Sequence, residues 1–111
     1  MNIPHIKIPI IPIELNKNIQ LFIKREDLIH AEISGNKFWK MFYNINSYLQ
    51  KKAKKPCVIT FGGAYSNHIA ATAAVGEQLG IATIGIIRGE ELSGKWHTNP
   101  TLIEAHNNGM T

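Results

Sequence analysis

The stretch CVITFGGAYSNHIAATAAVGEQLGIATIGII, residues 57–87, decides the fold that this chain is expected to adopt. Its first residues, 57–61, form a short apolar run without alternation, which is typical of a strand buried on both faces of a sheet. A pair of glycines breaks that run, and residues 66–79 then predict an alanine-rich helix that ends at Gly80. Residues 81–87 predict a second buried strand. A strand, a helix and a strand in this order indicate a parallel sheet with a crossover helix.

The residues that precede this stretch predict one helix and an extended arm. Apolar side chains recur every three or four positions over residues 38–49, which is the period of a helix. Residues 25–35 have no such period and predict a loop, and residues 19–24 predict a strand that follows a turn at residues 16–18. Residues 5–13 alternate isoleucine with lysine and proline, so they exclude a central strand and predict an edge strand or an extended arm.

The residues that follow the stretch continue the alternation of helices and strands. Residues 88–97 are polar and contain glycine, so they predict a loop. A helix is predicted over residues 99–107, with Asn99 as its cap and Pro100 at its first position. A strand is expected next, at residues 110–111, and the chain is expected to stop in the middle of the fold. The expected fold class is therefore α/β with a parallel sheet.

The composition is that of one small globular domain with a modest core. The chain has 111 residues, of which 44% are hydrophobic. Its net charge of +4 comes from 12 basic and 8 acidic residues, and favours anionic ligands such as phosphates and carboxylates. Lys51, Lys52, Lys54 and Lys55 form a cluster that we interpret as a solvated helix end. Nucleic-acid binding is disfavoured because no aromatic residue interleaves with these lysines.

Single residues and short runs bear on location and metal chemistry. The one cysteine, Cys57, cannot form a disulfide within the chain, fits a reducing cytoplasm and is interpreted as an inert core thiol. Neither a signal-peptide pattern nor an apolar run of about 18 residues is visible, so no membrane span is expected. The five histidines are not paired at metal-ligand spacing, and no metal site is expected.

A candidate catalytic lysine lies in the segment Ser34-Gly35-Asn36-Lys37-Phe38-Trp39-Lys40. Lys37 falls in the first turn of the helix predicted there. A helix N-terminus disfavours a cation and so favours the free amine that a Schiff-base lysine needs. The structural alternative, which the position alone leaves open, is a lysine that is merely solvated.

A candidate anion site lies in the segment Phe61-Gly62-Gly63-Ala64-Tyr65-Ser66-Asn67-His68, where a strand leads through a glycine turn into a helix. Such a junction presents backbone N–H groups to an anion, and glycines let a ligand approach the backbone closely. The segment is neither a Walker A loop nor the dinucleotide-binding fingerprint. The structural alternative is a plain glycine turn in which Ser66 or Asn67 caps the helix.

Taken together, the two segments resemble the 1-aminocyclopropane-1-carboxylate deaminase and D-cysteine desulfhydrase family of fold-type-II pyridoxal-phosphate enzymes. The matching stretches are Lys24-Arg25-Glu26-Asp27-Leu28, Ser34-Gly35-Asn36-Lys37 with Lys40, and Gly62-Gly63-Ala64-Tyr65-Ser66-Asn67-His68. The resemblance implies a three-layer parallel-sheet fold like that of the tryptophan synthase β subunit, incomplete at the C-terminus. Residues 1–55 would form an arm, a strand and the cofactor-lysine helix. Residues 56–111 would form the start of the smaller α/β domain, with the Ser-Asn-His loop, truncated before its end.

The resemblance also implies which residues contact the cofactor, pyridoxal 5'-phosphate. Lys37 matches the lysine that binds the cofactor covalently. Asn67 matches the asparagine that hydrogen-bonds the cofactor's ring hydroxyl. Lys40 matches a lysine that reaches the cofactor's phosphate.

On the substrate side, the resemblance implies contacts from Gly63, Ser66, Asn67 and His68. The backbone from Gly63 to Asn67 would hold the substrate carboxylate. Ser66 would contact the amino acid or help to deprotonate it, so the expected catalytic residues are Lys37 and Ser66. His68 fits the motif without a definite role.

The activity implied by the resemblance is deamination or elimination on a small amino acid. The cofactor acts as the electron sink in such reactions. 1-Aminocyclopropane-1-carboxylate would yield 2-oxobutanoate and ammonia, whereas D-cysteine would yield pyruvate, sulfide and ammonia. The motifs fit both substrates, and the full-length protein is expected to be a homodimer.

The chain departs from the family pattern in two ways. Trp39 stands where a basic residue is common, which we interpret as a change in helix packing. The chain is also shorter than family members and lacks their phosphate-binding glycine loop, so by itself it is expected to be inactive. The alternative to a catalytic portion is a non-catalytic truncated α/β fragment or an anion-binding module.

Overall fold

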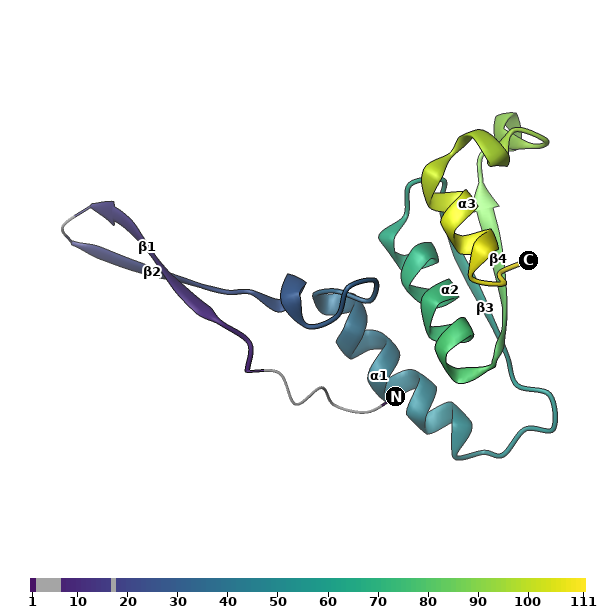
Figure 1. The fold of residues 1–111 in the computed structure, drawn as a ribbon, viewed down its shortest axis with the longest axis horizontal. Helices are drawn as coiled ribbons and strands as arrows, with labels where there is room; N and C mark the ends of the chain where they lie inside the picture. Colours follow the sequence, from purple (N-terminus) through teal and green to yellow (C-terminus); the bar gives the residue numbers. More distant parts are fainter. Residues whose placement is uncertain (2–6, 17) are drawn as a thin grey trace.

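The computed structural model of this protein describes residues 1, 7–16 and 18–111. An antiparallel hairpin comes first, and helices and strands then alternate (Figure 1). The strands are β1 (Ile10–Asn16), β2 (Ile19–Lys24), β3 (Cys57–Gly63) and β4 (Ala82–Arg88), and the helices are α1 (Asn36–Leu49), α2 (Asn67–Leu79) and α3 (Pro100–Asn107). The segments predicted as loops contain the short 3-10 helices η1 (Glu26–Leu28), η2 (Glu90–Leu92) and η3 (Trp96–Thr98).

Strands β1 and β2 form a two-stranded hairpin that projects away from the rest of the molecule (Figure 1). The radius of gyration is 17.0 Å, whereas a compact domain of 100 residues has about 13 Å. Among the described residues β1 pairs with β2 alone, so residues 10–13 form the expected edge strand. Residues 2–6, part of the expected arm, and Lys17 of the expected turn lie outside the described residues.

Strands β3 and β4 form a parallel sheet, as the sequence predicts, and pair in register along their whole length. After α3 the chain returns to β4. The N–H group of Thr111 donates to the carbonyl oxygen of Thr83 at 3.0 Å, and the N–H group of Gly85 donates to the carbonyl oxygen of Thr111 at 2.8 Å. The strand expected after α3 therefore begins at this point. Helices α2 and α3 lie on the same face of the sheet (Figure 1), because successive right-handed crossovers run in one direction.

Helix α2 is the central helix of the molecule, which explains why its apolar residues show no single face. Ala71, Ala74 and Val75 pack with α1 in one buried cluster. Ile69 and Ala73 pack with α3 in a second buried cluster. The small side chains let α1 and α3 approach α2 from two sides, as the alanine-rich sequence indicates.

Some boundaries differ from those that the sequence predicts. A break is expected at Gly62 and Gly63, but β3 continues through both, because they pair with Ile87 and Arg88 of β4. Ser66 is the cap of α2 and not its first helical residue. Strand β4 begins and ends one residue later than predicted.

The prediction that both parallel strands are buried on both faces is wrong for the described residues. The exposed fractions are 57% for Ile59, 69% for Phe61, 37% for Ile84 and 48% for Ile86. Side chains alternate along a strand, so these four lie on the face opposite α2 and α3, which no described helix covers. Cys57, expected in the core, is half-buried.

The observed fold is α/β with a parallel sheet. Among the described residues, helices cover one face of that sheet, so the three-layer fold-type-II arrangement and the incomplete C-terminus stay predictions. The division of the chain at residue 55 also stays a prediction, and one buried cluster crosses it by joining α1 to α2.

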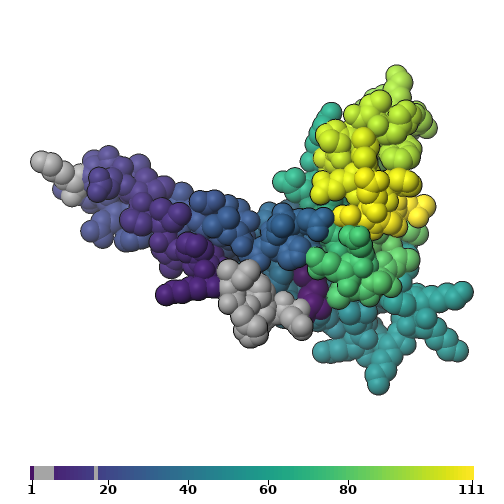
Figure 2. Space-filling model, in the orientation of Figure 1, coloured from purple at the N-terminus to yellow at the C-terminus, as the bar shows by residue number. Residues whose placement is uncertain are grey.

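The lysine cluster at residues 51–55 is exposed, which confirms the interpretation of a solvated segment. Its side chains spread into solvent between α1 and β3, in teal in Figure 2. None of the helices among the described residues is long and apolar enough to cross a membrane.

Gly76 of α2 lies so close to β4 that no side chain fits there. A Cβ atom would stand 2.4 Å from Thr83 Cγ2 and 2.9 Å from the carbonyl oxygen of Ile81. We expect Gly76→Ala to lower the free energy of unfolding by about 1–3 kcal/mol through this overpacking, although alanine usually favours a helix over glycine by about 1 kcal/mol. Urea denaturation measures the difference. In the control Gly63→Ala, the Cβ meets no described atom within 4 Å, so a similar loss there would contradict the prediction.

The uncovered face of the sheet should bind hydrophobic dyes and promote association. Ile59 and Ile84 are cross-strand partners on this face. Replacing both with threonine should lower the fluorescence of bound anilinonaphthalene sulfonate and cost at most about 1 kcal/mol of stability. The matched control is Val75→Thr, at a site that is 2% exposed, where a buried hydroxyl should cost about 1–3 kcal/mol. If the double variant and Val75→Thr lose the same amount of stability, the face of the sheet that carries Ile59 and Ile84 is covered.

Candidate functional site

One cavity brings together most of the residues that the two sequence segments single out. Its volume is about 630 Å³, and it lies where the loop that leads into α1 meets the N-terminus of α2. Lys37, Ser66, Asn67 and His68 all line it. The rest of α1 and strand β3 separate Lys37 from the other three along the chain, so the tertiary structure brings these residues together.

Lys37 reaches the cavity because a glycine turns the chain immediately before α1. Gly35 has φ 59° and ψ −141°, a conformation that side chains rarely allow. Its N–H group donates to the carbonyl oxygen of Glu26 at 2.8 Å, which closes the loop. Among the described residues, no side chain caps the N-terminus of α1. The Lys37 amine therefore stands at the positive end of a helix dipole, as the sequence predicts.

Ser66 is held in place as the N-cap of α2. Its Oγ atom accepts the N–H groups of His68 at 3.2 Å and of Ile69 at 3.4 Å. Of the two caps that the sequence allows, the structure selects Ser66 rather than Asn67. A Cβ atom on Gly62 would stand 2.9 Å from Ser66 Oγ and 2.7 Å from Ile69 Cγ1, so only glycine fits there.

The cap limits what the Ser66 hydroxyl can do. A hydroxyl group has two acceptor lone pairs and one donor hydrogen. Because Oγ already accepts two N–H groups, its hydrogen is the part that remains for a ligand. In this geometry Ser66 is suited to donate a hydrogen bond.

His68 lies in a positive electrostatic environment. Burial lowers the pKa of His68, and the positive charges of Lys37 and Lys40 lower it further. Both effects favour the neutral form of the His68 ring. The effect of these charges means that both lysines lie near the His68 ring.

Two predicted contact residues do not line the cavity. Lys40 acts on His68 only through its charge. Gly63 contributes its carbonyl oxygen, which accepts the Ser66 N–H group at 3.1 Å. The contact of Lys40 with a phosphate and that of Gly63 with a substrate stay predictions.

Two carboxylates at the cavity escaped the sequence reasoning. Glu32 comes from the loop before α1, and Glu104 comes from α3. Glu32 Oε1 accepts a hydrogen bond from Asn108 Nδ2 at 3.3 Å. No motif connects Glu104 with Lys37, and the packing of α3 beside α2 brings it there. Only a correct prediction that both crossover helices share one face would have found it.

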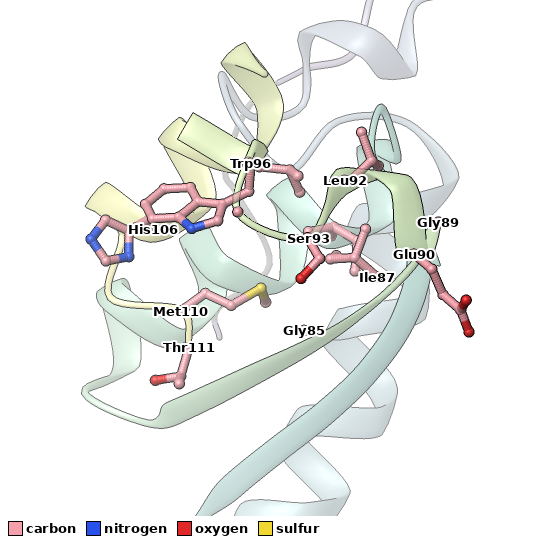
Figure 3. A pocket seen from close by; sticks show the side chains of 13 residues that line it. Gly85, Ile87, Gly89, Glu90, Leu92, Ser93, Trp96, His106, Met110 and Thr111 are labelled. Carbon is pink, nitrogen blue, oxygen red and sulfur yellow. The ribbon is translucent and has the colours of Figure 1, made fainter. Parts of the chain in front are cut away.

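A second cavity, of about 620 Å³, is lined by none of the predicted site residues (Figure 3). Ile87, Leu92 and Met110 give it an apolar wall. The rings of Trp96 and His106 stand at its side, with centroids 4.7 Å apart. The lining groups do not form the amine, amide and hydroxyl set of the first cavity.

The described part of the chain contains no group of three or more histidine, cysteine, aspartate or glutamate side chains that could hold a metal ion. Its charged pairs are local. Lys24 Nζ lies 2.8 Å from Glu26 Oε1, and Arg25 NH2 lies 2.6 Å from Asp27 Oδ2. Both pairs are exposed and contribute little stability.

Comparison with known proteins supports the resemblance. A protein of Pyrococcus horikoshii with the name "Putative 1-aminocyclopropane-1-carboxylate deaminase" is 40% identical over 77 residues, which are 68% of this chain and 23% of the relative. The mitochondrial bifunctional D-cysteine desulfhydrase/1-aminocyclopropane-1-carboxylate deaminase of Arabidopsis thaliana is 36% identical over 78 residues, 70% of this chain and 19% of the relative. The D-cysteine desulfhydrase of Salmonella paratyphi B is 32% identical over 68 residues, 61% of this chain and 20% of the relative.

No protein-family model matches the chain. The matched residues span only 19% to 23% of the length of these three curated relatives. The names of the relatives agree with the family that the two motif segments indicate. Over the part that these relatives match, the chain is therefore similar to 1-aminocyclopropane-1-carboxylate deaminases and D-cysteine desulfhydrases.

Proposed function

We propose that this chain is a portion of a pyridoxal-phosphate-dependent enzyme that acts on 1-aminocyclopropane-1-carboxylate or D-cysteine, with Lys37 as the cofactor-binding lysine. The observation that supports this most is the single cavity shared by Lys37, Ser66, Asn67 and His68. The names of the relatives support the same two amino acids. Since the chain spans a small part of those relatives, the activity is proposed for the whole protein.

The groups at the cavity fit the chemical groups of the cofactor. Lys37 offers an amine for the aldehyde, Asn67 offers an amide for the ring hydroxyl, and the N-terminus of α2 attracts an anion. The volume of about 630 Å³ falls within the roughly 300–1,000 Å³ of small-molecule sites. When bound, pyridoxal phosphate supplies an electron sink for the charge that develops on the substrate.

The side chains around the cavity suit the charged groups of an amino acid. The Ser66 hydroxyl, which keeps its hydrogen for a ligand, donates to the substrate carboxylate at the positive end of α2. The neutral ring of His68 is able to accept a proton. The carboxylate of Glu104, which also lines the cavity, attracts the substrate's ammonium group. Lys40 adds positive charge beside His68, which favours a phosphate.

Covalent labelling tests the role of Lys37. The chain is mixed with pyridoxal phosphate and reduced with borohydride, and peptide mass spectrometry locates the label. We expect the label on Lys37 in excess over Lys51, Lys52, Lys54 and Lys55, because only Lys37 lies in a cavity with matching partners. Lys37→Ala should abolish that excess, whereas the control Lys51→Ala should preserve it. A label spread evenly over the surface lysines would favour the non-catalytic fragment or the anion-binding module.

The titration of His68 tests the electrostatics of the site. Lys37→Met removes a positive charge that lowers the pKa of His68, so this pKa should rise while burial still holds it below the ordinary value. NMR of the imidazole signals across the acidic range measures the change. Lys51→Met, on the exposed segment, is the matched control and should leave the pKa of His68 where it is.

The same titration has a consequence for stability. The folded chain favours neutral His68, so its contribution is complete above the ordinary pKa of 6.5 and falls as the pH drops below that value. Lys37→Met should therefore lose less stability on acidification than the unmodified chain. If the pKa of His68 is unchanged in Lys37→Met, the two side chains lie too far apart to share the proposed site.

A further inference from the structure

The loop that delivers Lys37 to the cavity contains a histidine that binds the backbone of the loop itself. His30 Nδ1 accepts the N–H groups of Glu32 and Ile33, both at 3.1 Å. His30 Nε2 lies 2.8 Å from the side-chain amide of Gln78, on the last turn of α2. One imidazole ring therefore holds the loop together and ties it to the central helix.

These contacts determine the protonation of the His30 ring. Nδ1 accepts two N–H groups, so it carries no hydrogen, and a neutral imidazole then has its hydrogen on Nε2. An N–H group at Nε2 needs an acceptor. The amide atom 2.8 Å from His30 Nε2 is Gln78 Nε2, and two N–H donors cannot bond to each other. Because the two ends of a side-chain amide have nearly the same shape, turning the Gln78 amide over brings its oxygen to His30 as the acceptor.

The ring lies between two buried anchors of the same loop. Ile29 is 1% exposed and Ile33 is 0% exposed, and both belong to the buried cluster of α1 and α2. Two residues after Ile33, the Gly35 N–H group donates to the carbonyl oxygen of Glu26. His30 and Gln78 thus fix the middle of the loop that precedes α1. The end of the loop leads to Lys37, which lines the cavity.

We propose that His30 is a positioning residue for Lys37, acting as a neutral ring with its hydrogen on Nε2. This inference rests on the proposed function for the importance of Lys37, but the loop geometry stands apart from it. The polar bonds of His30 select one conformation of residues 30–35 and thereby place the Lys37 amine beside Ser66 and His68. Without the ring, Ile29 and Ile33 still hold the loop in the core, but its backbone turn is no longer fixed.

The test uses three variants of the full chain. His30→Ala removes all the ring contacts. His30→Asn keeps an acceptor on Cγ that can bind the same backbone N–H groups, as asparagine does in turns. Gln78→Ala removes only the tie to α2, at an exposed position where folding is not at risk.

The first readout is independent of any cofactor. Nitrogen-15 NMR of the ring should show His30 with hydrogen on Nε2 and not on Nδ1. Amide hydrogen exchange at Lys37, whose N–H group donates to the Ser34 carbonyl at 3.3 Å, should be roughly ten-fold faster in His30→Ala and should return toward the original rate in His30→Asn. Exchange at the buried Val75 amide should not change, which controls for general unfolding.

The second readout is the label of pyridoxal phosphate and borohydride on Lys37, relative to Lys51. It should fall in His30→Ala, fall less in Gln78→Ala and recover in His30→Asn. A hydrogen on Nδ1, or unchanged exchange at Lys37 in His30→Ala, would overturn the positioning role. If the original chain shows the expected ring and exchange but no preference for Lys37 in labelling, the proposed function fails while the role of His30 in fixing the loop stands.

Discussion

The close approach of α2 to β4 is the contact on which the rest of this structure depends. Gly76 lies against Thr83 and Ile81 with no room for a Cβ atom, so the helix axis lies as near to the sheet as the backbone allows. Helices α1 and α3 then pack on the two sides of α2 through its small residues. Bulkier side chains on α2 would move it away from the sheet, from α1 and from α3. The segments that line the cavity would then no longer meet.

The candidate site follows from how α2 begins. Gly62 leaves space for Ser66, Ser66 caps the helix, and the cap fixes the direction of Asn67 and His68. The loop before α1 runs beside the same helix, fixed by buried isoleucines and by the polar contacts of His30. The lysine proposed to bind the cofactor needs such support at its loop–helix junction, because a side chain on a poorly held loop samples many positions.

The electrostatics of the cavity agree with a site for a small zwitterion and an anionic cofactor. Burial, followed by the charges of Lys37 and Lys40, lowers the pKa of His68. Ser66 retains one hydrogen to donate, and the carboxylate of Glu104 lines the cavity. The family comparisons, which rest on sequence alone, point to enzymes named for amino-acid chemistry.

The sequence by itself determined the order of helices and strands, the parallel pairing of β3 with β4, the caps at Asn99 and Gly80, and the resemblance to the deaminase and desulfhydrase family. Those features depend on local periodicity, on turn chemistry and on motifs a few residues long. Only the tertiary structure decided that one face of the sheet is uncovered among the described residues, that Ser66 rather than Asn67 caps α2, and that Glu104 joins the cavity. Burial and long-range meetings depend on which elements pack together, and the period of a single segment carries no information about its neighbours.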